Sequence, residues 1–418
     1  MKKIIPVLLL FVTVQIFGQR DFNKPGEPSF PKLIYTQTLA LSEDSVANIY
    51  YFFKLPYQNI VFLKNGYEYN AQVRIDIEVT DTNSNFIKRE IKDWKIKTPS
   101  YEQTNLTNLF AEGFISIKLN NGAYNLLPIF TDLNSNREIK LKRERLNIKE
   151  VININPLVID SKKINCNGNE YFRLTNFEGN IPFGIKDYNL IIPSADTSVR
   201  ELSVTVLSVG DTIIQRKLSE SFLYSLAFEE CSGYIIINDK GKIQTRNFIL
   251  DNFSHKLKEG PFTIIVDELD IKYVGVANWY NKPKSLSFPD ISIHALEYIE
   301  DEVVIDSLLD IDSDKQYNAL VKYWKRKDPT PETEYNELMN EYYSRVDYAQ
   351  LNFSTLTGTK GVNTDRGKIY IMFGKPDKIE RNSNSSGKVV ETWIYNNPQR
   401  KFVFVDKQGV GEFSLESS

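Results

Sequence analysis

Alternating apolar and polar residues dominate the first two-thirds of the chain. The clearest case is 73–80 (VRIDIEVT), in which every second residue is aliphatic. Such alternation predicts a strand with one face toward a core and the other toward water. Residues 81–85 are rich in Asp and Asn and predict a turn, and 86–96 are expected to form the partner strand.

The same pattern recurs at short intervals. Segments 115–119, 124–130 and 138–148 have strand character and are separated by polar turns, and the pattern restarts after Pro156. Short strands at this spacing, without long helices between them, favour antiparallel sandwiches. We therefore predict a mostly β fold that begins with two Ig-like β-sandwich domains, at 32–150 and 151–270.

The period changes after residue 270. Residues 271–309 are expected to be a connector with short helices, because two prolines interrupt it and short helical turns follow. From Ser313, a candidate N-cap, the residues Tyr317, Leu320, Val321 and Trp324 fall on one helical stripe.

A second helix is predicted to start at Thr330-Pro331 and to run to Phe353. Alternation at 368–373, 390–395 and 401–405 then predicts a short antiparallel sheet, with a flexible loop at 382–387. Residues 310–418 are thus expected to form an α+β module, a helical hairpin followed by a small sheet.

The N-terminus predicts export. Lys2 and Lys3 precede an apolar run that ends near Phe17, which is shorter than the roughly 20 residues that span a bilayer. This favours a cleaved signal peptide at 1–18, followed by an extended lead-in at 19–31, and the alternative is an uncleaved membrane anchor. No later apolar run is long enough to cross a membrane, so no transmembrane segment is expected after cleavage.

Composition and charge limit the classes of function that we expect for the chain. The chain of 418 residues is 41% hydrophobic and 25% charged, with a net charge of -3, so no general attraction to nucleic acid is expected. Cys166 and Cys231 either form a disulfide, as an oxidising compartment would allow, or remain free thiols. Two cysteines and two histidines do not provide a usual zinc ligand set, and we expect no metal and no cofactor.

Several short motifs lie in order over residues 310–415. They are Tyr323 to Pro331 (with Asp328 and Pro329), Tyr343, Arg345, Tyr348, Ala349, the loop Gly361 to Gly367 (with Thr364), Gly374 to Asp377 (with Pro376), Trp393 to Tyr395 and Phe402 to Asp406. Together these motifs resemble the GWxTD-domain family of bacterial envelope proteins, in which Gly361 to Gly367 is the signature loop, although Val362 stands where the family has Trp. The resemblance implies envelope location and β-domains ahead of the module, but no mechanism.

The signature region also contains the candidate binding residues. Asp365 and Asp377, with Arg366 beside the first, either form a carboxylate pair of the kind glycosidases use or accept backbone N–H groups in their own turns. Trp393 and Tyr395 lie on one face of a strand, as either a sugar-stacking platform or sheet core.

These observations favour an exported, non-enzymatic interaction or structural protein of the cell envelope, with an envelope protein or glycan as partner and no nucleic acid. The alternatives are a glycan hydrolase that uses Asp365 and Asp377, and, by analogy of architecture alone, an accessory factor in outer-membrane assembly. The sequence leaves the oligomeric state open.

Overall fold

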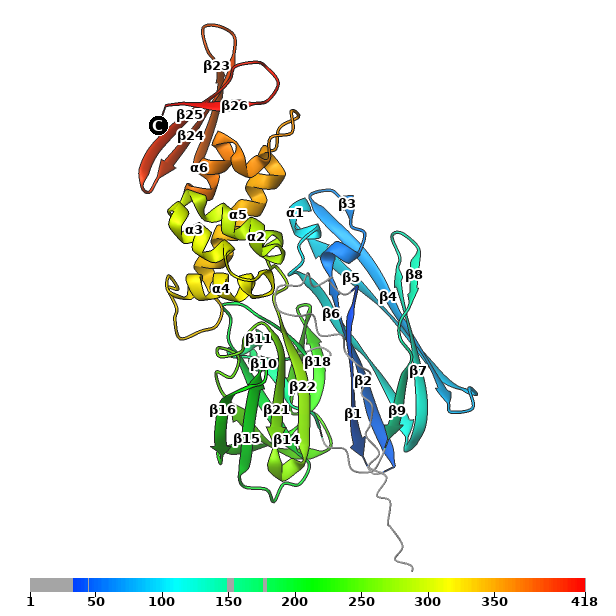
Figure 1. The fold of residues 1–418 in the computed structure, drawn as a ribbon. Coiled ribbons are helices and arrows are strands. Elements are labelled where there is room, and N and C mark those ends of the chain that lie inside the picture. Colours follow the sequence, from blue (N-terminus) through cyan, green and yellow to red (C-terminus); the bar gives the residue numbers. More distant parts are fainter. Residues whose placement is uncertain (1–32, 44, 149–153, 176–178, 418) are drawn as a thin grey trace, which may run out of the picture.

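The computed structural model describes residues 33–43, 45–148, 154–175 and 179–417. The expected signal peptide (1–18) and lead-in (19–31) lie outside these residues. Figure 1 shows sheets in the blue to green part of the chain, then helices, then a small sheet at the C-terminus. The prediction of a mostly β fold is confirmed, and most of the described strands pair antiparallel.

The first β unit, residues 33–148, contains a three-stranded and a six-stranded antiparallel sheet. Alternate side chains of β4, among them Val73 and Ile75, are fully buried against the other sheet. Its elements are β1 (Tyr35–Glu43), β2 (Val46–Pro56), β3 (Leu63–Asn65), β4 (Glu68–Asp81), β5 (Phe86–Thr98), α1 (Tyr101–Thr104), β6 (Phe110–Asn120), β7 (Gly122–Asp132), β8 (Arg137–Lys140) and β9 (Glu144–Ile148).

The second β unit, residues 154–278, contains sheets of order β10-β14-β20-β17, β11-β12-β19-β18 and β13-β22-β21-β15-β16. Only the β13–β22 pairing is parallel among the strand pairs described. The strands are β10 (Leu157–Asp160), β11 (Ile164–Cys166), β12 (Asn169–Arg173), β13 (Asn180–Pro182), β14 (Tyr188–Ser194), β15 (Leu202–Ser208), β16 (Asp211–Leu218), β17 (Ser221–Ser225), β18 (Ala227–Cys231), β19 (Tyr234–Asn238), β20 (Gln244–Leu250), β21 (Gly260–Val266) and β22 (Ile271–Asn278).

Strand β22 corrects the expected boundary. The sequence predicts a connector from residue 271, but residues 271–277 pair with β21. One inward position of this strand is Gly275, where a Cβ would lie 2.2 Å from Cζ of Phe262. The bulky Phe262 therefore fills the space of the missing side chain, and the strand carries a weaker apolar signal than its neighbours.

The C-terminal module, residues 279–417, packs helices on a four-stranded antiparallel sheet of order β23-β24-β25-β26. The predicted helix over 313–324 is confirmed as α4. The elements are α2 (Pro289–His294), α3 (Glu302–Leu309), α4 (Ser313–Lys325), α5 (Glu337–Phe353), the 3-10 turn η5 (Gly361–Asn363), α6 (Asp365–Phe373), β23 (Lys378–Ser383), β24 (Val389–Asn396), β25 (Gln399–Asp406) and β26 (Phe413–Ser417).

The predicted strand at 368–373 is wrong, because these residues belong to α6. Ile369 and Ile371 are both buried, although they lie on different sides of a helix, since α6 packs against α5 and the sheet together. A short apolar run that is enclosed on several sides cannot be assigned from its period. The first strand of the sheet is instead β23, which includes the start of the predicted flexible loop.

Two predicted caps are also wrong. Helix α5 begins at Glu337 rather than at Thr330-Pro331, and Asn336 caps it by accepting a hydrogen bond from the Met339 N–H at 2.8 Å. At the start of α4 the N-cap residue is Asp312, not Ser313, and it makes no side-chain cap bond. Thr330 is instead held in a turn by Asp328.

The two β units share an apolar core on the outer face of the β1-β2-β6 sheet. The Phe228 ring lies 4.9 Å from the Phe52 ring, centroid to centroid. Charged side chains lie at the same junction. Arg173 Nη2 lies 2.9 Å from Glu112, Arg173 Nη1 lies 3.5 Å from Asp160, and Lys54 Nζ lies 3.7 Å from Glu112.

A separate set of contacts joins the module to the second β unit. The Lys282 ammonium lies 2.8 Å from Glu259 and 4.3 Å from the centre of the Tyr317 ring. The Tyr317 hydroxyl donates to the same carboxylate at 3.0 Å. Within the described residues, no helix has the length and apolar character needed to cross a membrane.

Candidate functional site

The signature loop forms a corner between α5, α6 and the sheet. The Thr364 hydroxyl donates to the Gly361 carbonyl at 2.8 Å, and its oxygen accepts the Gly367 N–H at 3.1 Å. Thr364 is therefore the N-cap of α6, and its side chain also bridges the two ends of the loop. Figure 1 shows α6 between α5 and the terminal sheet.

Glycine is required at two positions of this corner by close backbone approach. A Cβ on Gly361 would lie 2.0 Å from the Ala349 carbonyl oxygen of α5. A Cβ on Gly367 would lie 1.9 Å from the Gly361 carbonyl oxygen. Any side chain at either position would push α5, the loop and α6 apart.

Asp365 links the start of α6 to the edge of the sheet. Its Oδ2 accepts the Leu415 N–H of β26 at 2.8 Å. The expectation that Asp365 pairs within its own turn is wrong, because Thr364 performs that role. A carboxylate at the first turn of a helix is also favoured by the helix dipole.

Asp377 makes an equivalent link beyond the other end of α6. Its Oδ2 accepts the Asn396 N–H at 2.7 Å, so it too bonds outside its own turn. Gly374 ends α6 at a φ of 76°, and its carbonyl accepts the Tyr395 hydroxyl at 2.9 Å. Pro376 lies between these two anchored residues.

Arg366 points toward a buried carboxylate that the sequence analysis did not identify. Glu391 of β24 is 1% exposed and lies 2.7 Å from Arg381 Nε and 3.8 Å from Arg366 NH1. The Arg366 guanidinium also lies 4.1 Å from the centre of the Phe413 ring. Burial lowers the pKa of Arg366, and the Glu391 charge partly offsets this effect.

The only sequence signal for Glu391 is its position. It has the same parity as Trp393 and Tyr395, so the strand pattern places a charged residue on the inward face. The Trp393 indole donates to Glu391 at 2.6 Å. Trp393 and Tyr395 are 1% and 4% exposed, so both rings lie in the sheet core and neither is open to a sugar.

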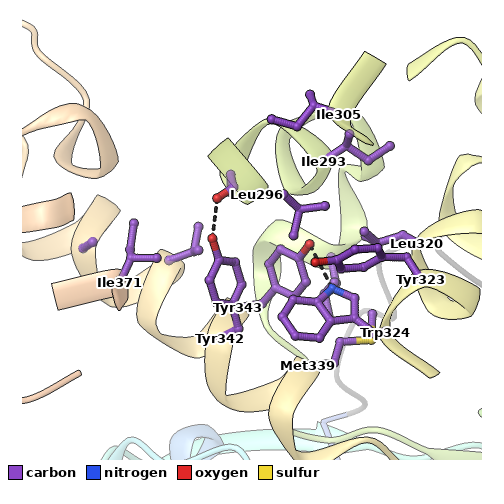
Figure 2. Close-up of a cluster of buried hydrophobic side chains, with 14 of the residues drawn as sticks. Ile293, Leu296, Ile305, Leu320, Tyr323, Trp324, Met339, Tyr342, Tyr343 and Ile371 are labelled. Atoms are coloured by element: carbon purple, nitrogen blue, oxygen red, sulfur yellow. Dashed lines mark hydrogen bonds between the residues drawn. The ribbon is translucent and has the colours of Figure 1, made fainter. Parts of the chain in front are cut away.

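The helical part of the module is built around Trp324. Figure 2 shows its indole beside Tyr342 and Tyr343, and the Trp324 N–H donates to the Tyr343 hydroxyl at 3.3 Å. The Tyr343 hydroxyl donates in turn to the Ser292 carbonyl at 2.9 Å. Burial raises the pKa of Tyr343 well above its ordinary value, so this phenol stays protonated.

The motif Asp328-Pro329 lies just after the end of α4. The Asp328 side chain is fully buried, accepts the Thr330 N–H at 3.0 Å and lies 3.1 Å from Lys325 Nζ.

Val362, at the position of the family Trp, is half-buried against the module core, and its carbonyl accepts a hydrogen bond from the Tyr298 hydroxyl at 2.8 Å.

The motif residues therefore serve one compact assembly of backbone and side-chain bonds. Residues 267–416 match the family model of the GWxTD domain. The C-terminal part of the chain contains a GWxTD domain. Its GWxTD domain begins upstream of residue 310, the start expected from the motifs, and takes in β22 and the short helices. A comparison with curated proteins found no match.

The two cysteines lie away from this corner, in the second β unit. Cys166 at the end of β11 and Cys231 at the end of β18 are joined by a disulfide. It connects the turns of two β-hairpins.

Proposed function

We propose that this GWxTD-domain protein is an exported, non-enzymatic protein of the cell envelope that acts by binding a protein or glycan partner. Export rests on the N-terminal signal pattern, and we propose the periplasm or cell envelope as its location. The two β units are proposed to be Ig-like sandwich domains that hold the GWxTD domain.

One observation carries the non-enzymatic proposal. Asp365 and Asp377, the acids of the signature region, each accept a backbone N–H, from Leu415 and Asn396 respectively. A glycosidase needs one carboxyl group free to give a proton and another facing the sugar. Carboxylates engaged by backbone donors are suited to holding α6 against the sheet.

Exposed apolar side chains in two loops support a binding role. Leu356, after α5, is 95% exposed, and Tyr67, in the β3–β4 turn, is 98% exposed. Large apolar groups that project into solvent are available for contact with a partner.

The test is photo-crosslinking in intact cells. A photoreactive residue replaces Leu356 or Tyr67 in the full chain. The matched control is Ser385, an exposed polar residue in the same module as Leu356. We expect a discrete crosslinked envelope partner from Leu356 or Tyr67 and none from Ser385. Loss of export on deletion of residues 2–18 tests the proposed location.

The competing hydrolase function makes a different prediction. Purified protein would cleave a cell-wall or capsular glycan, and Asp365→Asn would abolish that cleavage while the chain stays folded. That result would overturn the non-enzymatic proposal. Recovery of outer-membrane assembly proteins from the Leu356 crosslink would support the accessory-factor alternative.

A further inference from the structure

A single carboxylate of the second β unit holds two strands of the first. Glu230, near the end of β18, lies 2.9 Å from Lys92 Nζ and 3.2 Å from the Trp94 indole nitrogen, both on β5. It also accepts the Phe114 N–H of β6 at 3.0 Å. We refer to Glu230 and these three partners as the Glu230 clamp.

The clamp covers an open strand edge. Within the described residues, β6 pairs only with β2, so no strand forms a backbone ladder with its other edge. At that edge Glu230 binds the Phe114 N–H, and Lys92 donates to the Phe114 carbonyl at 3.3 Å. Side chains thus occupy backbone groups that would otherwise be free to pair with another strand.

The disulfide lies directly beside the clamp. Cys231 follows Glu230 and pairs with Tyr234 across a two-residue turn, Ser232-Gly233, in which both residues have positive φ (52° and 81°). Its partner Cys166 belongs to the neighbouring β11–β12 hairpin.

Tyr234, the residue that follows this turn, is linked to the first β unit through Arg173. The Arg173 guanidinium lies 3.9 Å from the centre of the Tyr234 ring, and its NH2 group lies 2.9 Å from Glu112 of β6. The disulfide-bonded turn is therefore flanked by two contacts between the units, one through Glu230 and one through Tyr234 and Arg173.

We propose that the Cys166–Cys231 disulfide is a redox-controlled lock on the joint between the two β units. A dithiol reductant attacks one sulfur, forms a mixed disulfide and then its own internal disulfide. Two electrons and two protons pass to this chain, which leaves Cys166 and Cys231 as thiols. The released turn lets Glu230 leave β5 and β6, and the Phe114 edge becomes exposed.

The Phe114 amide is a direct reporter of this lock, since its hydrogen bond is part of the clamp. Amide hydrogen exchange is measured on the full chain, oxidised and after mild treatment with dithiothreitol under native conditions. We expect exchange at Phe114 to become at least about tenfold faster on reduction, the loss expected for a hydrogen bond to a charged group. Amides in the middle of α5 serve as an internal control and are expected to be unchanged.

Two variants keep the result decisive. Glu230→Ala is expected to accelerate exchange at Phe114 in the oxidised protein, and the exposed Glu220→Ala in the same unit is the matched control with no effect. Unchanged Phe114 exchange on reduction would overturn the lock, and so would equal acceleration in α5, which would indicate general loss of stability. This outcome is independent of the proposed function, because the measurement involves no partner.

Discussion

The signature corner and the junction between the β units are both held by carboxylates, but these carboxylates have different partners. In the corner, Asp365 and Asp377 accept backbone N–H groups. At the junction, Glu112 and Lys54 of the first unit, 5% and 3% exposed, meet Arg173 and Asp160 of the second. The two aspartates of the corner bond to main chain, whereas the charged side chains of the junction pair with each other.

This difference has energetic consequences. A carboxylate bonded to a backbone N–H depends on one partner that every residue except proline supplies. Buried charges depend on one another, so the loss of one leaves the others unpaired in a poorly solvating environment. Among the described atoms, Glu112 Oε2 and Arg173 Nε already have no hydrogen-bond partner. The junction should therefore be more sensitive to a change of charge than the two aspartates of the corner.

The largest expected effect is at the junction. Glu112→Gln removes the negative charge that faces both Lys54 and Arg173, and we expect unfolding free energy to fall by about 3–5 kcal/mol in a denaturant titration. In the double variant Lys54→Met/Glu112→Gln the cost should be smaller than the sum of the single costs. Strict additivity would show that the charges do not depend on each other.

A steric change at the corner comes next. Gly361→Ala places a Cβ 2.0 Å from the Ala349 carbonyl oxygen, so we expect a loss of about 3 kcal/mol in the same titration. Gly184→Ala is the control, because a Cβ there meets nothing within 4 Å, and its effect should stay within about 0.5 kcal/mol. Equal stabilities for the two variants would contradict the close packing of the corner.

A smaller effect is expected from the helix cap. Thr364→Ala removes the acceptor for the Gly367 N–H and should reduce stability by about 1 kcal/mol. Thr364→Ser keeps the hydroxyl and should recover most of that loss. If serine fails to do so, the threonine methyl group, rather than the cap, is what the corner needs.

The smallest effect at neutral pH should come from Tyr335. Burial raises the pKa of Tyr335 to about 12, whereas an unfolded tyrosine loses its proton near pH 10. Between these values the folded state binds more protons, so this tyrosine makes stability fall as pH rises. Tyr335→Phe should match the wild type at pH 7 and lose less stability from pH 10 to 12. Parallel curves would contradict the raised pKa.

Much of the local structure follows from sequence pattern. The alternation at 73–80, the turn at 81–85 and the partner strand at 86–96 correspond to β4, its turn and β5. The stripe from Tyr317 to Trp324 corresponds to α4. These predictions succeed because each element has one buried face, and one buried face imposes its own period on the chain.

The candidate site was only partly visible in the sequence. Its motifs identified the glycines, Thr364 and the two aspartates, but α6 was expected to be a strand because it is buried on several sides. Glu391 gave no signal beyond its inward parity. The partners of Asp365 and Asp377 lie 50 and 19 residues away along the chain, so no local pattern indicates them.

The sequence by itself determined where strands and helices alternate and which family the C-terminal part resembles. Only the tertiary structure decided the role of the polar residues. Apolar burial depends on the period of one segment, whereas a charged side chain that is held in the fold needs a specific partner. For Glu112, Glu230 and Asp365 that partner comes from a distant part of the chain, which folding alone brings within hydrogen-bond distance.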